Sequence, residues 1–405
     1  MKFALKHIAL LALTACLLSA CDWFTPEQVP TRRVFILYAA AYSNLSESIK
    51  QDISELTEGY LPAKNSGDIV LIYAHHAGPG NNYLTSTESA LYRAYKAKDG
   101  TTVRDTLSVY PETDISGSAE TFHKVLSKAY ELYPSPSYGL LLTSHANGWI
   151  PVGYKEETPS LFKAMSVSEP GPKKEYPLTK EIGSEFSDES GIDLRDIADA
   201  IPMKLDYCIF DACLMGCVEV AYELKDKCDK ILFSPTEILS NGLIYTTMGP
   251  KLFNVQDPDL KAIGEEYFAY YQAQTGYYQS ATITLVDCTK LDALAKCCAD
   301  IISAHREQLA TVSHAQVQAY FYNDLHWFFD LRDIMFKAGA DSEEMARLDN
   351  ALKECIPYKA ATDHFFDLKL NEVCGLSMYF PLSSWKELNE YYKTLAWNNA
   401  THLVQ

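Results

Sequence analysis

Short apolar runs recur along the chain, and each has the length of a strand that is buried on both faces. These runs cover residues 34–41, 69–74, 138–143, 207–210, 231–233 and 281–286. Continuous apolar runs, unlike alternating ones, are typical of strands in a parallel sheet that is covered on both sides. The pattern therefore predicts a sheet whose strands lie in the interior.

Between the runs, apolar residues recur every three or four positions, which predicts helices. The spacing of Leu45, Ile49, Ile53 and Leu56 indicates a helix over residues 45–58, and further helices are expected over 117–132 and 216–226. Residues 88–110 are more polar and predict a hairpin that turns at Asp99 and Gly100. Alternating strands and helices indicate an α/β fold with a mostly parallel sheet flanked by helices on both faces, followed by a helical C-terminal extension.

The first residues have the features of a bacterial lipoprotein signal peptide. Lys2 and Lys6 precede an apolar run over residues 8–18, which is too short to span a membrane. Residues 18–21, Leu-Ser-Ala-Cys, resemble a lipobox, in which Cys21 is lipidated. We expect residues 1–20 to be the signal peptide and 21–30 a tether, so that lipid attaches the exported protein to a membrane of the cell envelope.

The alternative is an ordinary signal peptide cut after Ala20, with Cys21 incidental. For the lipoprotein, the outer membrane or cell surface is expected rather than the inner membrane. No later segment has about 18 uninterrupted apolar residues, so no further span is predicted.

The chain is acidic, and this excludes some partners. Its formal net charge is −18, and removal of residues 1–20 takes away two lysines and no acid. Such a charge argues against nucleic acid and anionic lipid as partners.

Eleven cysteines are present, of which Cys16 and Cys21 belong to the signal region. Export permits disulfides, but the other nine are an odd number and most lie in apolar segments. We expect most of them to be buried thiols, with one reactive thiol left over.

Residues 31–405 are expected to form one domain, with a C-terminal subdomain over about 290–405. Residues 155–190 differ from the rest, because they are rich in Glu, Lys, Ser, Pro and Gly. This composition predicts an exposed insertion between the third and fourth strands.

Two reactive side chains directly follow two apolar runs that are consecutive along the chain. His145 comes directly after the third strand, and Cys213 after the fourth. Ligands and catalytic groups of open α/β sheets gather at the carboxyl ends of the strands. If the two strands are neighbours, the imidazole can activate the thiol of Cys213, and the helix expected after Gly216 would favour the thiolate. Taken singly, a buried cysteine and a scaffold histidine are the commoner interpretations.

The segment around Cys213 resembles the catalytic-cysteine segment of the clostripain family, which belongs to the same peptidase clan as caspases, legumains and gingipains. The most specific match is residues 211–216, Asp-Ala-Cys-Leu-Met-Gly. Supporting matches are Val34 to Tyr38 with Asn44 and Leu45, His145 with Gly148 and Trp149, and residues 375–381. The resemblance covers residues 33–390 and implies a caspase-like fold and a cysteine endopeptidase.

By this resemblance, Cys213 is the nucleophile and His145 the base, and no third residue is required. The backbone amides of Ala146 and Cys213 would stabilise the oxyanion. The clan usually has glycine where this chain has Ala146. Alanine still offers its amide, but it has fewer backbone conformations.

The resemblance also implies where the substrate binds. Asp211 matches the aspartate of the primary specificity pocket, where a carboxylate pairs with Arg or Lys before the cleaved bond. Asp211 could instead cap a helix or brace the strand end. Glu237 is a weaker second candidate for the pocket, and Trp149 is expected either to shape the cleft wall or simply to pack.

Family members are often activated by self-cleavage between the histidine and the cysteine. The segment 155–190 supplies Lys155, Lys163, Lys173, Lys174 and Lys180. We hypothesise cleavage there, with Lys174 as the candidate position, and the alternative is an uncleaved surface insertion. No cofactor is required, although the resemblance allows calcium dependence without naming a site. His75 and His76 could bind a metal or act as a rival base, but scaffold is the favoured interpretation.

Two rival functions stay open. One is a catalytically weak relative that binds peptides or glycoproteins at the cell surface, which the departure at Ala146 keeps open. The other is a redox protein, which requires a second cysteine within bonding reach of Cys213. Cys217 is the nearest in sequence, at a spacing unusual for redox motifs.

Overall fold

The computed structural model describes residues 29–78, 87–154, 176–180, 191–321 and 327–405. Its centre is a nine-stranded sheet with the order β10-β8-β7-β6-β5-β1-β2-β3-β4. Strands β2, β1, β5, β6 and β7 run parallel, and the two outer strands on each side are antiparallel additions. The strands are β1 (Arg33–Ala41), β2 (Asp68–His76), β3 (Ser89–Lys96), β4 (Thr102–Tyr110), β5 (Tyr138–Thr143), β6 (Leu205–Asp211), β7 (Cys228–Phe233), β8 (Thr282–Asp287) and β10 (Tyr358–Ala361).

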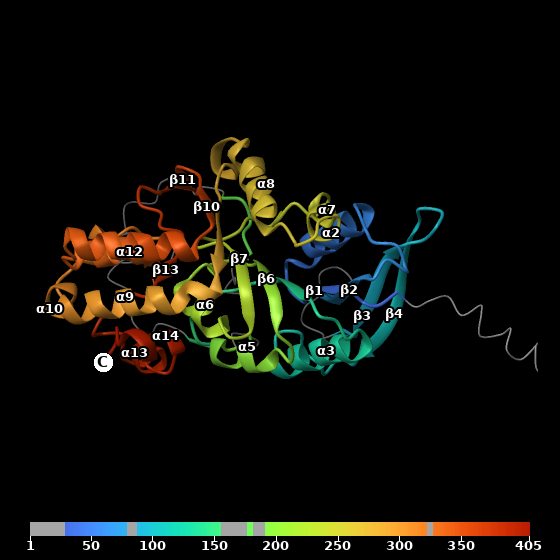
Figure 1. The fold of residues 1–405 in the computed structure, drawn as a ribbon, viewed down its shortest axis with the longest axis horizontal. Coiled ribbons are helices and arrows are strands. Elements are labelled where there is room, and N and C mark those ends of the chain that lie inside the picture. Colours follow the sequence, from blue (N-terminus) through green and yellow to red (C-terminus); the bar gives the residue numbers. More distant parts are fainter. Residues whose placement is uncertain (1–28, 79–86, 155–175, 181–190, 322–326) are drawn as a thin grey trace, which may run out of the picture.

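Helices cover both faces of this sheet (Figure 1). One face carries α2 (Ser46–Glu58), α7 (Met248–Phe253) and α8 (Leu260–Gln272), and the other carries α3 (Ala119–Leu132) and α5 (Leu194–Ala200). Helix α6 (Val218–Leu224) packs against α5. The caspase-like α/β fold expected from the sequence is thus confirmed.

The C-terminal third adds a layer of helices beyond the β8 end of the sheet (Figure 1). Helix α9 packs against α12 and α14, and α14 also contacts α6. These helices are α9 (Leu291–Ala304), α10 (Arg306–Leu309), α11 (Leu331–Lys337), α12 (Ser342–Cys355), α13 (Lys386–Tyr392) and α14 (Ala396–Thr401). Short pairs join β9 (Phe329–Asp330) to β13 (Ser377–Met378) and β11 (His364–Phe365) to β12 (Leu368–Lys369). Single 3₁₀ turns cover Gly276–Tyr278, Cys288–Lys290 and His314–Gln316.

The hydrophobic pattern predicted the central strands within a few residues. The polar hairpin is also confirmed, as β3 and β4, and it extends the sheet at one edge. Its polarity follows from that position, because most β4 side chains are exposed or half-buried. The antiparallel β8 and β10 were not expected, since a run buried on both faces does not reveal its direction. No helix in the part of the chain that the structure describes is long and apolar enough to cross a membrane.

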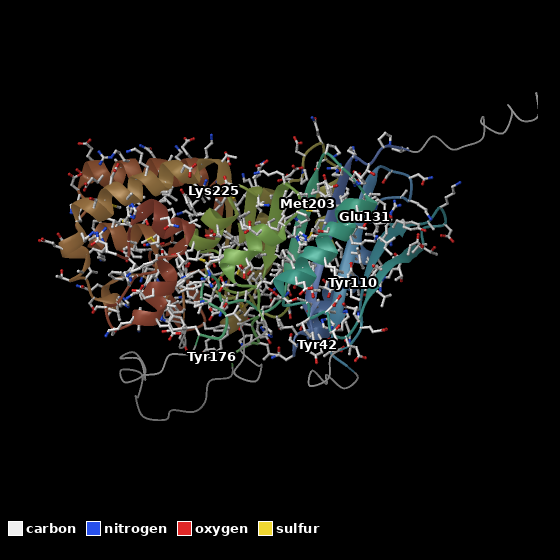
Figure 2. The ribbon with its side chains drawn as sticks, turned by 90° about the horizontal axis from the view of Figure 1, so that it is seen from below. Tyr42, Tyr110, Glu131, Tyr176, Met203 and Lys225 are labelled. Carbon is white, nitrogen blue, oxygen red and sulfur yellow. The ribbon has the colours of Figure 1, made fainter. Side chains whose placement is uncertain are left out.

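The two ends of the parallel strands lie at opposite edges of the molecule (Figure 2). Glu131, Met203 and Lys225, which precede strands β5, β6 and β7, lie toward one edge, whereas Tyr42, which follows β1, lies toward the other. Tyr176 lies at the same edge as Tyr42. The carboxyl ends of the parallel strands therefore share one edge, which is the place to examine for chemistry.

Candidate active site

Strands β5 and β6 are direct neighbours, so the condition set in the sequence analysis is met. They pair in parallel, with Thr143 opposite Asp211 in the register. His145 and Cys213 each lie two residues beyond this pair. The two side chains therefore start from the same edge of the sheet.

The loops that carry these two residues are in contact. Gly148 has φ +63°, and a Cβ at this position would lie 2.7 Å from the carbonyl oxygen of Leu214 and 2.6 Å from the Phe328 ring. Leu214, directly after Cys213, also adopts a positive φ of 60°. Such a conformation is costly for leucine, so the tight turn after Cys213 is held by its surroundings.

The imidazole of His145 is oriented by a residue from a third loop. Its Nε2 lies 2.6 Å from Oδ1 of Asn44, which follows β1, the other neighbour of β5. An oxygen acceptor at this distance places the ring proton on Nε2 and leaves Nδ1 with the lone pair that accepts a proton. Asn44 entered the sequence analysis only as part of a family match, without a role.

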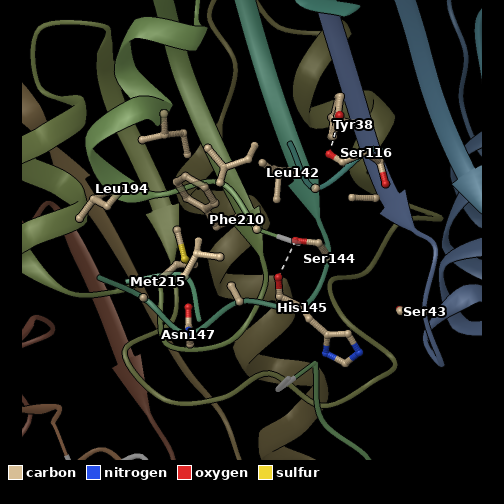
Figure 3. Close-up of a pocket in the computed structure, with 18 of the residues that line it drawn as sticks. Tyr38, Ser43, Ser116, Leu142, Ser144, His145, Asn147, Leu194, Phe210 and Met215 are labelled. Atoms are coloured by element: carbon tan, nitrogen blue, oxygen red, sulfur yellow. Dashed lines mark hydrogen bonds between the residues drawn. The ribbon is translucent and has the colours of Figure 1, made fainter. Parts of the chain in front are cut away.

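A cavity of about 220 Å³ adjoins His145 on the face of the sheet that carries α3 and α5. Its lining includes Leu142, Phe210 and Met215, and Figure 3 shows the His145 ring directed away from these apolar side chains. Because side chains alternate along a strand, the next residues, Thr143 and Asp211, point to the opposite face. The apolar cavity and the side chains of Thr143 and Asp211 thus lie on opposite faces of the sheet.

The sulfur of Cys213 is buried and contacts the backbone of Ile238. The amide of Ile238 donates to Sγ at 3.2 Å, and its carbonyl oxygen lies 3.6 Å from the same sulfur. Helix α6 begins only at Val218, and the field of a helix terminus falls off within one turn. The Ile238 amide is therefore a donor that favours a thiolate, and the helix expected directly after Gly216 begins later than predicted.

A lysine from the predicted insertion fills the pocket beside these groups. Lys180 is fully buried, and its ammonium contacts the Asp211 carboxylate, Oδ2 of Asp52 at 3.2 Å and Oγ1 of Thr143 at 3.1 Å. Burial lowers the pKa of Lys180, but the carboxylates of Asp211 and Asp52 outweigh it and raise the pKa above its ordinary 10.5. The lysine is therefore charged inside the pocket.

The backbone of the same segment pairs with the strand-like stretch that contacts Cys213. The amide of Lys180 donates to the carbonyl of Ile238 at 2.8 Å, and the amide of Ser240 donates to the carbonyl of Leu178 at 2.8 Å. Thr179 forms an antiparallel bridge with Leu239. The carbonyl oxygen of Ile238 thus contacts both the Lys180 backbone and the Cys213 sulfur. The Leu178 side chain, in contrast, is 73% exposed.

The expectation of an exposed insertion is wrong at Lys180. A composition rich in charged residues and glycine describes a segment on average, and it does not reveal one lysine whose charge two buried carboxylates neutralise. The other lysines of the segment, with the expected cleavage after Lys174, lie outside the described residues, as do the signal peptide and Cys21.

Asp211 lies at the base of this pocket. Besides the lysine, its Oδ2 accepts from Tyr245 Oη at 2.7 Å and from Thr143 Oγ1 at 3.4 Å. Asp211 thus contacts side chains around the pocket, which favours a role in the pocket over a role as a helix cap. Glu237, the second candidate, is buried after β7, but it is not among the side chains that contact the Lys180 ammonium in the described part of the chain.

Asp52 is the pocket residue that the sequence analysis missed. It lies on α2, and its spacing from Leu45, Ile49 and Leu56 places it on the buried face of that helix. A carboxylate on an apolar helix face needs a partner, and this was the available signal. Burial raises the pKa of Asp52 to about 7, against the lowering effect of Lys180.

Trp149 is fully buried, with its ring 4.6 Å from Tyr379 and 5.0 Å from Tyr392. This position favours packing over a role in the cleft wall.

The other sequence candidates also lie in the scaffold. His75 stacks on Tyr42 at 4.8 Å and hydrogen-bonds Ser116 through Nδ1. Burial lowers the pKa of His76 to about 4. In the described ranges, no group of three or more His, Cys, Asp or Glu residues is placed to hold a metal ion, so calcium is assigned no site.

Most other cysteines are thiols in the core, as expected. Seven of the eight described cysteines other than Cys213 are buried, and Cys297 is half-buried. Cys217, the one that a redox function would need, has a pKa held well above its ordinary value by burial and by Glu219. A thiol that stays protonated is a poor partner for disulfide exchange.

Known proteins resemble most of this chain. The model of the clostripain family matches residues 37–164 and 171–400. Clostripain of Hathewaya histolytica is 24% identical over 198 residues, which are 46% of this chain and 35% of that protein, so the match spans about a third of the relative's length.

Solved structures share the fold over nearly the whole chain. An inactive zymogen of a C11 protease from Parabacteroides distasonis has a TM-score of 0.74 and 26% identity, covering 93% of this chain and 99% of that one. A secreted C11 cysteine protease from Bacteroides thetaiotaomicron has a TM-score of 0.72 at 24% identity, covering 92% and 100%. With the family match spanning well over half of its length, this chain belongs to the clostripain family and is a cysteine endopeptidase.

Proposed function

We propose that this protein cleaves peptide bonds after Lys or Arg through the dyad of His145 and Cys213, and that it is made as a precursor whose own Lys180 occupies the specificity pocket. The single observation that carries the proposal is the burial of the Lys180 ammonium against Asp211 beside Cys213. A basic side chain already bound there acts as a stand-in for the substrate.

The backbone contacts of Lys180 support the same interpretation. An extended peptide that adds a strand to an exposed edge gains affinity from main-chain hydrogen bonds and specificity from side-chain pockets. Residues 178–180 do both, since they pair with residues 238–240 and place one side chain in the pocket. Leu178 points to solvent, so we expect little selectivity two residues before the lysine.

The proposed chemistry uses only groups of the chain, the substrate and water. Nδ1 of His145 takes the proton of the Cys213 thiol, and the thiolate attacks the carbonyl carbon of the basic residue itself. The oxyanion is held by backbone amides, for which Cys213 and Ala146 are the candidates. His145 then protonates the leaving amine, and water hydrolyses the thioester to release the acid and restore the thiol.

This geometry supports self-cleavage after Lys180 rather than after Lys174. Cleavage would convert the occupied pocket into one that is open to substrates. The relative described as an inactive zymogen is consistent with a precursor of this kind. We infer that the intact chain is inactive toward other peptides because its pocket is filled by Lys180.

The test is incubation of the purified chain beside the Cys213→Ala variant, with fragments identified by mass spectrometry. Cleavage after Lys180 in the first alone, followed by hydrolysis of Lys- or Arg-ended fluorogenic peptides, supports the proposal. Full activity of an uncut chain overturns the proposal that the protein is made as a precursor. Absence of hydrolysis under all conditions overturns the proposed peptidase activity and favours the rival function, a catalytically weak relative that binds peptides.

We also propose that Cys21 carries a lipid that anchors the enzyme in the cell envelope. The lipobox sequence and the acidic tether that follows it support this proposal. In an expressing bacterium, the native protein should partition into detergent with the membrane fraction, whereas Cys21→Ala should be released. Equal partitioning of the two forms contradicts the anchor.

A further inference from the structure

The Lys180 pocket is built from two carboxylates that come from different halves of the fold. Asp211 ends β6, and Asp52 reaches the same ammonium from α2. We propose that Asp52 is a second specificity-determining residue and that, with Asp211 and Thr143, it selects lysine over arginine before the cleaved bond. This rests on the proposed function, because Lys180 stands in for the substrate side chain.

The first argument is the match of donors to acceptors. An ammonium has three N–H donors, and the Lys180 ammonium contacts three oxygen acceptors, one each from Asp211, Asp52 and Thr143. Each N–H therefore has one acceptor. A guanidinium has five donors in a plane, so the same three oxygens would leave buried donors unpaired.

The second argument is the wall behind the ammonium. A Cβ on Gly242 would lie 2.8 Å from Nζ of Lys180 and 2.4 Å from Oδ2 of Asp211, so backbone closes the pocket there. Gly242 is held in place by Tyr271, whose hydroxyl donates to its carbonyl at 2.9 Å. Arginine is longer than lysine, and its terminal nitrogens would reach into this wall.

The third argument is the cost of burying Asp52. The residue is 2% exposed, and burial is the main cause of its raised pKa. An ion on a buried helix face is stabilised only if a partner of opposite charge is present. Lys180 is the cation that contacts it. In the processed enzyme, the ammonium of each bound substrate would supply the cation that the buried Asp52 carboxylate needs.

The experiment uses the self-processed enzyme and two fluorogenic peptides that differ only in a final Lys or Arg. Wild type is compared with Asp52→Asn, and Glu58→Gln serves as the control, because it removes a charge from the exposed side of the same helix. Any variant that processes slowly is cut with a trace of wild-type enzyme first.

We expect wild type to prefer lysine by about tenfold or more in kcat/KM. Asp52→Asn should lower kcat/KM for the lysine peptide by about 10- to 100-fold, mainly through KM, because one hydrogen bond to a charged group is weakened. The arginine peptide should change by less than about threefold, and the control should change neither. Equal losses on both peptides, no loss, or arginine preferred by wild type would overturn the inference.

A second measurement avoids any dependence on the folding of the Asp52 variant. Lys180→Arg, in an otherwise unchanged chain, should slow self-cleavage by about tenfold relative to wild type. Unchanged self-cleavage contradicts lysine selection but leaves the proposed peptidase intact. If wild type cuts neither its own chain nor either peptide, the proposed function fails instead, so the two failures are distinguishable.

Discussion

The side chain of Asn44, in the loop after β1, orients the imidazole of His145. Asn44 contacts Nε2 of His145 at 2.6 Å, and this contact decides which ring nitrogen carries the proton. A base that is held in one tautomer needs no reorientation before it accepts the thiol proton. Asn44 is therefore a positioning residue in the proposed mechanism.

Substitution of Asn44 by alanine should lower kcat by about 10- to 100-fold with KM changed by less than about threefold, because the acceptor acts on proton transfer and not on binding. Asn44→Asp keeps an oxygen acceptor and should recover most of the activity. Steady-state kinetics of the processed enzyme on a lysine peptide provide the comparison. Full activity of the alanine variant would remove Asn44 from the mechanism.

A second prediction at this scale concerns a buried acid outside the site. Glu219 on α6 accepts hydrogen bonds from the Tyr379 amide at 2.8 Å and the Tyr392 hydroxyl at 2.6 Å. Burial raises its pKa from the ordinary 4.5 to about 7, although these donors lower it. The folded chain therefore holds this proton more tightly than the unfolded chain, and protonation favours folding.

This stabilisation is fully present below about pH 4.5 and is lost as the pH rises through about 7. Glu219→Gln removes the titration while keeping an oxygen acceptor. The free energy of unfolding, measured in urea from pH 4.5 to 8, should fall more steeply with pH for wild type than for the variant. Parallel curves for the two proteins would contradict a raised pKa at Glu219.

At the scale of elements, the site depends on how two loops meet after β5 and β6. Gly148 allows close contact, since its φ is +63° and a Cβ would be 2.7 Å from Leu214 O. Gly100, in the β3–β4 turn, has a similar φ of +84° but no heavy atom within 4 Å of such a Cβ. An added side chain would be strained by the positive φ at both positions, but its Cβ would clash with neighbouring atoms only at Gly148.

Gly100→Ala should therefore cost only the strain, about 1–2 kcal/mol of unfolding free energy, and leave activity unchanged. Gly148→Ala should cost more and also lower the reactivity of Cys213, because its loop is displaced at Leu214. Chemical denaturation and thiol labelling of Cys213 measure the two effects. Similar behaviour of the two variants would show that the loop contact is unimportant.

At the scale of the whole molecule, Lys180 joins the insertion to two neighbouring strands of the sheet and to helix α2. It contacts Asp52 on α2, Thr143 on β5 and Asp211 on β6. Removal of one partner from a buried ion cluster leaves charge uncompensated and costs about 3–5 kcal/mol. The same change empties the pocket beside Cys213.

Lys180→Ala should accordingly lower the stability of the intact chain, abolish self-cleavage at this position and speed the alkylation of Cys213 by several-fold. Lys124→Ala, which breaks an ion pair in which the lysine is 53% exposed, is the matched control and should change none of the three by much. Slower or unchanged alkylation in the Lys180 variant would argue against a pocket that Lys180 blocks.

The sequence by itself determined the sheet, because runs such as residues 138–143 can be buried only as internal strands, and it determined which strand ends carry His145 and Cys213. Only the tertiary structure decided what surrounds them. Asn44 and Asp52 lie in one segment and Lys180 and Ile238 in two others, and no local pattern records that these three segments meet. The physical reason is that periodicity reports which face of an element is buried, whereas the partner of a buried charge is fixed by the packing of elements far apart in the chain.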